Sequence, residues 1–193
     1  RLERLKDTCL DTAILEKVDI QSRIQKCIEK LTPVASAKHV VFNVTVDNFV
    51  CRVIPDQLEI LLENIISNAI TYSHNNSSVE ISTVINRNQR SASVIITDHG
   101  IGIENKDLPN IFNEYFYFPR AAMHNKSSSG IGLSIVRIAA INNKLKIQVT
   151  SEPGVGTTFT VVFDYIEFPS KQQTSKPAAG INPNLSQSWI GIA

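Results

Sequence analysis

The chain has 193 residues, of which 42% are hydrophobic and 19% charged, and its formal net charge is +1. This length allows one well-packed domain that buries roughly 70% of its unfolded surface. The small net charge excludes a general attraction to nucleic acid or to an acidic membrane. No apolar run approaches the ~20 residues that span a bilayer, and we expect no signal peptide. Three cysteines without CxxC spacing predict reduced thiols in a cytosolic setting.

Apolar residues at three- and four-residue steps predict the helices of the chain. Residues 1–16 resemble the end of a longer helix, and a second helix over Ser22 to Leu31 is expected to stop near Pro33. The longest pattern runs from Leu58 to Ser73, and a last helix ends at about Asn142. A short helical turn is expected within residues 104–110.

Segments rich in β-branched and aromatic residues predict the strands. In chain order they are Val18–Ile20, Val40–Val46, Phe49–Ile54, Val79–Ile85, Ala92–Thr97, Leu145–Thr150 and Thr157–Asp164. The turn dipeptide Asp47-Asn48 predicts that the second and third of these form a hairpin. Residues 111–129 are irregular and long enough to predict a functional lid. From Glu167 onward the composition predicts a disordered tail.

The helix from Leu58 to Ser73 buries one apolar side and presents polar residues on another. Asn64 and Asn68 lie one turn apart, and Tyr72 follows one turn later, all off the apolar stripe. By itself this pattern fits an ordinary core helix with a solvated face. The motifs downstream favour a wall of a polar site.

Three glycine pairs follow strands or open helices, at Gly100/Gly102, Gly130/Gly132 and Gly154/Gly156. Asp98 ends a strand just before the first pair, so the backbone can approach a flat ring while the carboxylate accepts a hydrogen bond from an amine. The second pair opens a helix, whose free amides favour phosphate. Asn68 supplies a neutral oxygen of the kind that magnesium takes beside phosphate.

The ordered segments ENIISNAITYS, DHGIGI, IFNEYF, GIGLSIV and GVGTTF resemble the motifs of the sensor histidine kinase catalytic and ATP-binding domain. The resemblance covers about residues 18–165. It implies the Bergerat ATP-binding fold, an α/β two-layer sandwich with a mixed, mostly antiparallel sheet and helices on one face. Residues 1–17 are then the end of a dimerisation and phosphoacceptor helix, residues 18–166 the catalytic domain and residues 167–193 the tail.

The resemblance also implies roles for single residues, with ATP and Mg²⁺ as cofactors. Asn68 resembles the magnesium-binding asparagine, and Asn64 the residue that helps to hold metal and phosphates. Arg120 and Lys126 are the candidate cations of the lid, which with Asn64 would act in catalysis. The remaining expected nucleotide contacts are Tyr72, Asp98, Gly100, Gly102, Ile103, Phe112, Gly130, Gly132, Leu133 and Thr158, with Thr157 on the adenine side as well.

Several positions depart from the family pattern, and the reaction class stays open between three alternatives. Thr71 stands where many members carry a lysine, and Asn142-Asn143 replaces a glycine pair. Related Bergerat ATPases activate water with a glutamate in the position of Asn64, so we favour a kinase over a hydrolase; a non-catalytic nucleotide-binding or docking module is the third possibility. The implied partners are an upstream acceptor helix in a homodimer and a response regulator, in the cytoplasm.

Overall fold

The computed structural model describes residues 14–116, 130–164 and 166–167. Its elements are β1 (Glu16–Asp19), α2 (Ile20–Ala37), β2 (Val41–Thr45), β3 (Val50–Val53), α3 (Pro55–Tyr72), β4 (Ser78–Asn86), β5 (Ser91–Asp98), η1 (Leu108–Asn110), α5 (Gly132–Asn142), β6 (Lys146–Glu152) and β7 (Gly156–Phe163). The predicted lid cations Arg120 and Lys126 lie outside the described residues.

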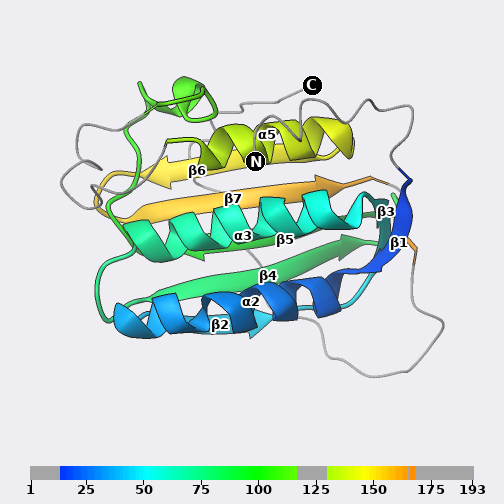
Figure 1. Ribbon diagram of the computed structural model, residues 1–193, viewed down its shortest axis with the longest axis horizontal. Helices are drawn as coiled ribbons and strands as arrows, with labels where there is room; N and C mark the ends of the chain where they lie inside the picture. Colours follow the sequence, from blue (N-terminus) through cyan, green and yellow to red (C-terminus); the bar gives the residue numbers. More distant parts are fainter. Residues whose placement is uncertain (1–13, 117–129, 165, 168–193) are drawn as a thin grey trace.

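Within the described ranges, a five-stranded sheet has the order β2-β4-β5-β7-β6. Strands β2 and β4 are parallel, and the other neighbours are antiparallel. Figure 1 shows α2, α3 and α5 side by side on one face of this sheet. The arrangement confirms the predicted two-layer α/β sandwich with a mixed, mostly antiparallel sheet.

The predicted hairpin of residues 40–46 and 49–54 is wrong. Strand β2 pairs with β4, whereas β3 pairs antiparallel with β1 in a separate two-stranded sheet. The Asn48 side chain explains the local geometry, because it donates to Asp19 (2.6 Å) and accepts from the Gln21 amide (3.2 Å). Asn48 is thereby bonded to the start of α2 instead of closing a turn between two paired strands.

The small sheet also receives the end of the described chain. Glu167, predicted as the first residue of the tail, exchanges backbone hydrogen bonds of 2.9 and 2.7 Å with Val50. Its carboxylate lies 2.5 Å from the Lys17 ammonium on β1. Glu167, which follows β7, is therefore bound to both strands of the small sheet, β1 and β3.

Helix α2 is longer than predicted and runs through Pro33 to Ala37. A proline inside a helix removes one backbone donor and crowds the preceding turn. The Thr32 hydroxyl just before Pro33 donates to the Ile28 carbonyl (2.7 Å) in the preceding turn. Burial of Ala35 beyond the proline favours the continued helix.

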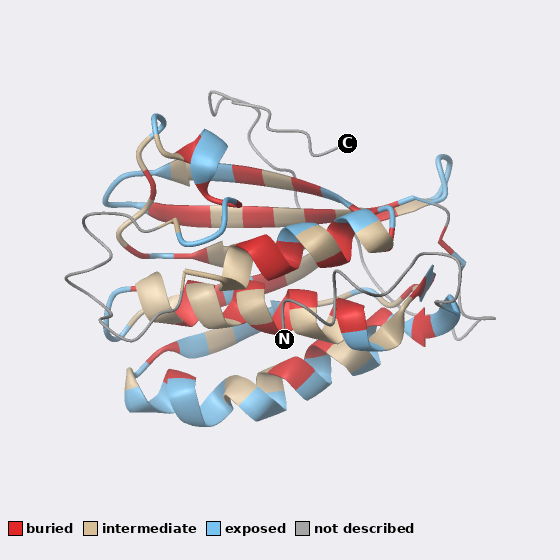
Figure 2. Cartoon of the chain, turned by 45° about the horizontal axis from the view of Figure 1, so that its top comes forward, coloured by how far each residue is buried: buried red, intermediate tan, exposed pale blue. Residues whose placement is uncertain are grey.

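The core lies between the sheet and the inner sides of the helices (Figure 2). Helix α3 contributes its whole predicted apolar stripe, from Leu58 to Ala69, and these side chains are at most 3% exposed. Alternate residues of β5 and β7 face the same core because side chains alternate along a strand. Asp98 and Thr157 belong to these inward rows.

A buried polar network connects the end of α5 with the start of α3. The Asn143 side chain accepts from the Ile54 amide (2.6 Å) and donates to Gln57 (3.2 Å) and to the Ala139 carbonyl (2.8 Å). Asn143 and Gln57 are 7% and 4% exposed. The asparagine that replaces a glycine in the family pattern thus holds two helices together.

Candidate functional site

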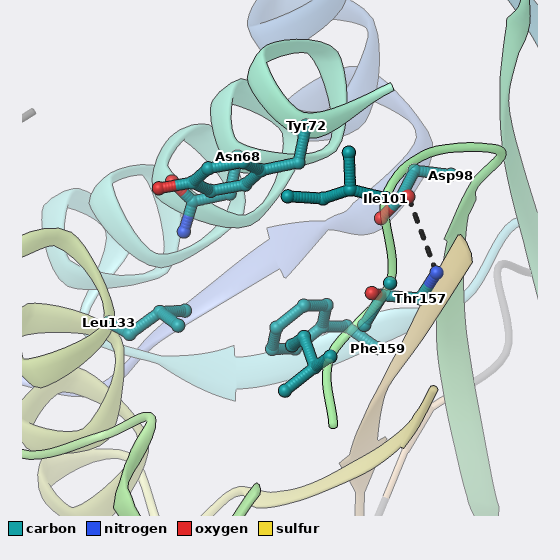
Figure 3. Close-up of a pocket in the computed structure, with 9 residues that line it drawn as sticks. Asn68, Tyr72, Asp98, Ile101, Leu133, Thr157 and Phe159 are labelled. Carbon is teal, nitrogen blue, oxygen red and sulfur yellow. Dashed lines mark hydrogen bonds between the residues drawn. The ribbon is translucent and has the colours of Figure 1, made fainter. Parts of the chain in front are cut away.

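A pocket opens between α3, the loop that follows β5, the first turn of α5 and β7 (Figure 3). It is lined by Asn68, Tyr72, Asp98, Ile101, Gly102, Ile103, Leu133, Thr157 and Phe159. Most of these residues were predicted as nucleotide contacts. Ile101 and Phe159 were not, and they add apolar surface to the lining. The pocket therefore combines apolar walls with a carboxylate at one end and a carboxamide at another.

Asp98 lies at the end of β5 and is only 4% exposed. Burial raises the pKa of its carboxyl group from 3.8 to about 7. The Thr157 amide, which donates to it at 3.3 Å, acts in the opposite direction, as do His99, the Gly100 amide and Lys38. A buried carboxylate with so few donors has unused acceptor capacity that faces the pocket.

The loop that carries Asp98 touches its neighbours at positions where only glycine fits. A Cβ at Gly100 would lie 1.9 Å from the Tyr72 carbonyl oxygen, and one at Gly102, with φ of +63°, 2.1 Å from that of Glu152. The Ile101 amide donates to the Tyr72 carbonyl at 3.1 Å. The glycines therefore let the loop lie directly between the end of α3 and the β6–β7 turn.

The phosphate side of the predicted site lies where α3 meets the start of α5. Asn64 donates through Nδ2 to the Ile60 carbonyl (2.7 Å), and a Cβ at Gly132 would lie 3.1 Å from its Oδ1. Ile131, at the N-cap of α5, makes no side-chain capping bond, and Gly130 has φ of +63°. The first amides of α5, which lack partners within the helix, and two carboxamides form a surface suited to phosphate oxygens.

The donor set fits a magnesium ion that arrives with a nucleotide. Among the described residues, no group of three or more His, Cys, Asp or Glu side chains could hold a metal. Asn68 lines the pocket and offers a neutral oxygen. Magnesium is commonly held by a few protein oxygens together with substrate phosphates and water, and Asn68 suits that role.

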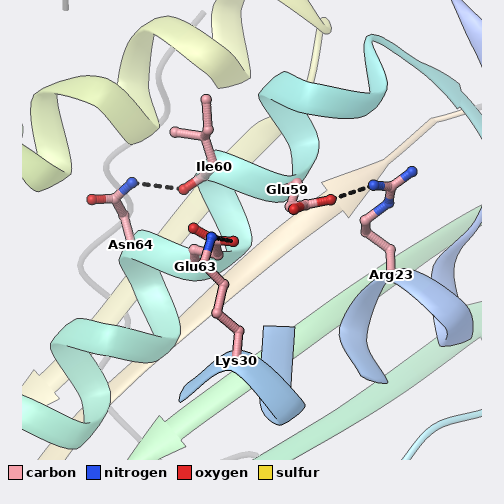
Figure 4. A network of polar contacts seen from close by, with 6 residues as sticks. All are labelled: Arg23, Lys30, Glu59, Ile60, Glu63 and Asn64. Carbon is pink, nitrogen blue, oxygen red and sulfur yellow. Dashed lines mark hydrogen bonds and ion pairs between the residues drawn. The ribbon is translucent and has the colours of Figure 1, made fainter. Parts of the chain in front are cut away.

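Glu63, the acidic neighbour of Asn64, points toward Lys30 on α2 (Figure 4). It is 9% exposed, and its carboxylate lies 2.5 Å from the Lys30 ammonium. Arg23 and Glu59 form a second ion pair between the same two helices. Glu63 is thus engaged between helices and does not line the pocket, so it is poorly placed to activate water there.

Some predicted contacts lie beside the pocket rather than in its lining. Phe112 is 5% exposed and packs in the core. The Thr158 hydroxyl lies 3.0 Å from that of Thr97, which belongs to the row of β5 facing away from Asp98. Thr157, not Thr158, lines the pocket. Strand alternation could have distinguished these two threonines, since Thr157 pairs with Asp98 and both lie on one face.

These features define a nucleotide-binding module with an α/β sandwich, and comparison with known proteins assigns its family. Residues 53–167 match the family described as histidine kinase-, DNA gyrase B- and HSP90-like ATPase, and the chain belongs to this family. Within it, the relatives identify the catalytic and ATP-binding domain of the sensor histidine kinase type.

One relative is the sensor-like histidine kinase SenX3 of Mycolicibacterium smegmatis, which is 32% identical over 178 residues that cover 90% of this chain and 42% of the relative. The signal transduction histidine-protein kinase ArlS of Staphylococcus aureus is 30% identical over 148 residues, 77% of this chain and 32% of that protein. The chain thus spans less than half the length of these relatives.

Solved structures support the same fold. The mycobacterial sensor histidine kinase MprB superposes with a TM-score of 0.69 at 23% identity, over 81% of this chain and all of that one. The catalytic domain of histidine kinase ThkA gives a TM-score of 0.67 at 18% identity, over 78% and 95% of the two chains. The predicted Bergerat fold is confirmed. No helix in the described part of the chain is long and apolar enough to cross a membrane.

Proposed function

We propose that this domain binds ATP with Mg²⁺ in the described pocket and transfers the γ-phosphoryl group to a histidine on an upstream dimerisation helix. The buried Asp98 carboxylate is the main support for the proposal, because it faces an apolar pocket and can accept further hydrogen bonds there. An adenine ring in this pocket would donate its exocyclic amine to Asp98 and pack against Ile103 and Phe159. Tyr72 lies at the edge of the same pocket.

The phosphates would extend toward α5. Asn68 and Asn64 offer carboxamide oxygens there, and Gly132 leaves room at the free helix amides. Magnesium, when bound, neutralises phosphate charge. In the transfer, the bond from the γ-phosphorus to its bridging oxygen breaks and a bond to an imidazole nitrogen forms, with ADP leaving and the imidazole proton passing to solvent. Arg120 and Lys126 stay candidates for the cation beside the γ-phosphate.

The position of Glu63 favours transfer to a protein acceptor over hydrolysis. A water-directed ATPase needs a general base near the γ-phosphate. Asn64 cannot act as one, and Glu63 is paired with Lys30 between helices. A neutral imidazole is itself a nucleophile, so positioning and charge neutralisation suffice. The complete protein would act in the cytoplasm as a homodimer, with a response regulator that takes the phosphoryl group.

Two measurements test this function. Calorimetry with Mg-ATP should show binding to the parent chain, and Asn68→Ala should lose the magnesium-dependent part, whereas Asn43→Ala, exposed on the edge strand β2, should bind like the parent. Chains extended upstream through the acceptor helix, incubated with γ-labelled ATP, should carry an acid-labile label. Steady phosphate release without an acceptor would favour the ATPase instead. Absence of magnesium-dependent ATP binding would favour the non-catalytic nucleotide-binding or docking module, in which Thr71 marks lost activity.

A further inference from the structure

Lys38 follows α2 and connects it to the far end of α3. Its Nζ donates to two carbonyls of the last turn of α3, those of Ile70 at 3.1 Å and Thr71 at 2.5 Å. Carbonyls in the last turn of a helix lack partners within the helix and carry the negative end of its dipole. An ammonium group that binds two of them fixes the position of that turn.

The turn that Lys38 binds is the support of the Asp98 loop. The carbonyl of Tyr72 accepts from the Ile101 amide (3.1 Å), and the His74 amide donates to the His99 carbonyl (3.0 Å). Gly100 lies directly against Tyr72, so a shift of this turn would displace the loop as well. Tyr72 itself lines the pocket. Lys38 therefore acts on the pocket through α3, although it does not line it.

Lys38 also contributes charge to the surroundings of Asp98. Burial lowers the pKa of the Lys38 ammonium, and the Asp98 carboxylate opposes that shift. The other groups that face Asp98 are the amides of Thr157 and Gly100 and the imidazole of His99. His99 is itself 3.1 Å from Glu80 on β4 and exposed to solvent. Lys38 is thus a half-buried cation near a carboxylate that is costly to ionise.

We infer that Lys38 is a positioning residue for the adenine end of the pocket, which holds the last turn of α3 against the Asp98 loop and favours the carboxylate form that accepts the purine amine. The inference rests on the proposed function, since it assigns the adenine to Asp98. It predicts that loss of Lys38 weakens the binding of the base, not of the magnesium and phosphates.

The test compares Lys38→Met with Lys38→Arg and with the control Lys26→Met, which replaces an exposed lysine within α2. Calorimetry measures the affinity for Mg-ATP and for ADP in EDTA. Lys38→Met should weaken both affinities by roughly tenfold, because it removes the two charge-assisted hydrogen bonds that hold the last turn of α3 against the Asp98 loop. Lys38→Arg should restore most of the affinity, and Lys26→Met should match the parent. Asn68→Ala should affect Mg-ATP alone.

A pH profile separates this role from a general loss of stability. The midpoint of ADP affinity against pH should move upward in Lys38→Met, and a titration of free ADP corrects for protonation of the nucleotide itself. If the parent binds nucleotide, the proposed function stands. Equal affinities and equal pH midpoints in the parent and Lys38→Met would then overturn the inference about Lys38 alone. If Lys38→Met does not fold, the same midpoint for Lys38→Gln and the parent would overturn it. A parent that binds neither nucleotide refutes both.

Discussion

Replacing Asp98 by asparagine should make the protein more stable and unable to bind nucleotide well. The carboxyl group is 4% exposed, and burial raises its pKa from 3.8 to about 7. Asparagine keeps an oxygen that can accept from the Thr157 amide and carries no charge to desolvate. Its amide group, however, would present donors as well as an acceptor to the purine amine, which weakens recognition.

The sign and size of the stability effect follow from linkage. Because the folded-state pKa lies above the unfolded-state value, the native protein binds more protons, and ionisation of Asp98 costs stability. The cost is absent below pH 3.8, grows as the pH rises, and is complete above about pH 7. It reaches about 4 kcal/mol, of which about 2–3 kcal/mol develops between pH 5 and 8.

Urea unfolding of the parent and of Asp98→Asn at pH 5, 6, 7 and 8 measures this effect, since the other titrating groups cancel in the difference. The stability advantage of Asp98→Asn should grow across this range. ATP should reverse the order, because it stabilises only the protein that binds it. A difference that stays constant with pH would refute the assignment of a raised pKa to Asp98.

Two further substitutions test the packing that supports the site. Asn143→Ala should lower the free energy of unfolding by about 3 kcal/mol, because it leaves the Ile54 amide and the Gln57 side chain without partners; a loss below about 1 kcal/mol in urea unfolding would contradict this. Gly156→Ala should lower the melting temperature of the protein strongly. Residue 156 has φ of +147°, and an added Cβ would lie 1.9 Å from the Asp98 carbonyl oxygen of β5. Gly154→Ala is the matched control, with φ of +82° and nothing within 4 Å, and an equal effect of both would exclude the steric explanation.

The sequence predicted the central helix well, because its apolar period is long and unbroken. It failed for the pairing of β2 and β3, because β-branched residues predict that a segment is a strand but not which strand pairs with it. The partner of β2 is β4, more than thirty residues later, and the short loop at Asp47 gave a stronger local signal for a hairpin. The predicted helix end near Pro33 was wrong for a similar reason, since tertiary packing outweighed the tendency of proline to end a helix.

Most of the site could be predicted because Asp98, Asn68 and the glycines belong to short motifs with defined spacing. Phe159 could not, because a single phenylalanine in a strand has no spacing that distinguishes a pocket wall from the core. Lys38 lies more than thirty residues from the helix turn that it binds, and its role depends on a contact between two helices. A single sequence carries no signal for such a contact.

Helix α3 is held at both ends by side chains from its two neighbouring helices. Asn143, which follows α5, binds the Ile54 amide at its start, and Lys38, which follows α2, binds the carbonyls of its last turn. Both ends of a helix leave backbone groups unpaired, and here side chains satisfy several of them without using the face that carries Asn64 and Asn68. The two carboxamides therefore stand on a fixed support. Binding of a nucleotide is then expected to leave the position of α3 unchanged.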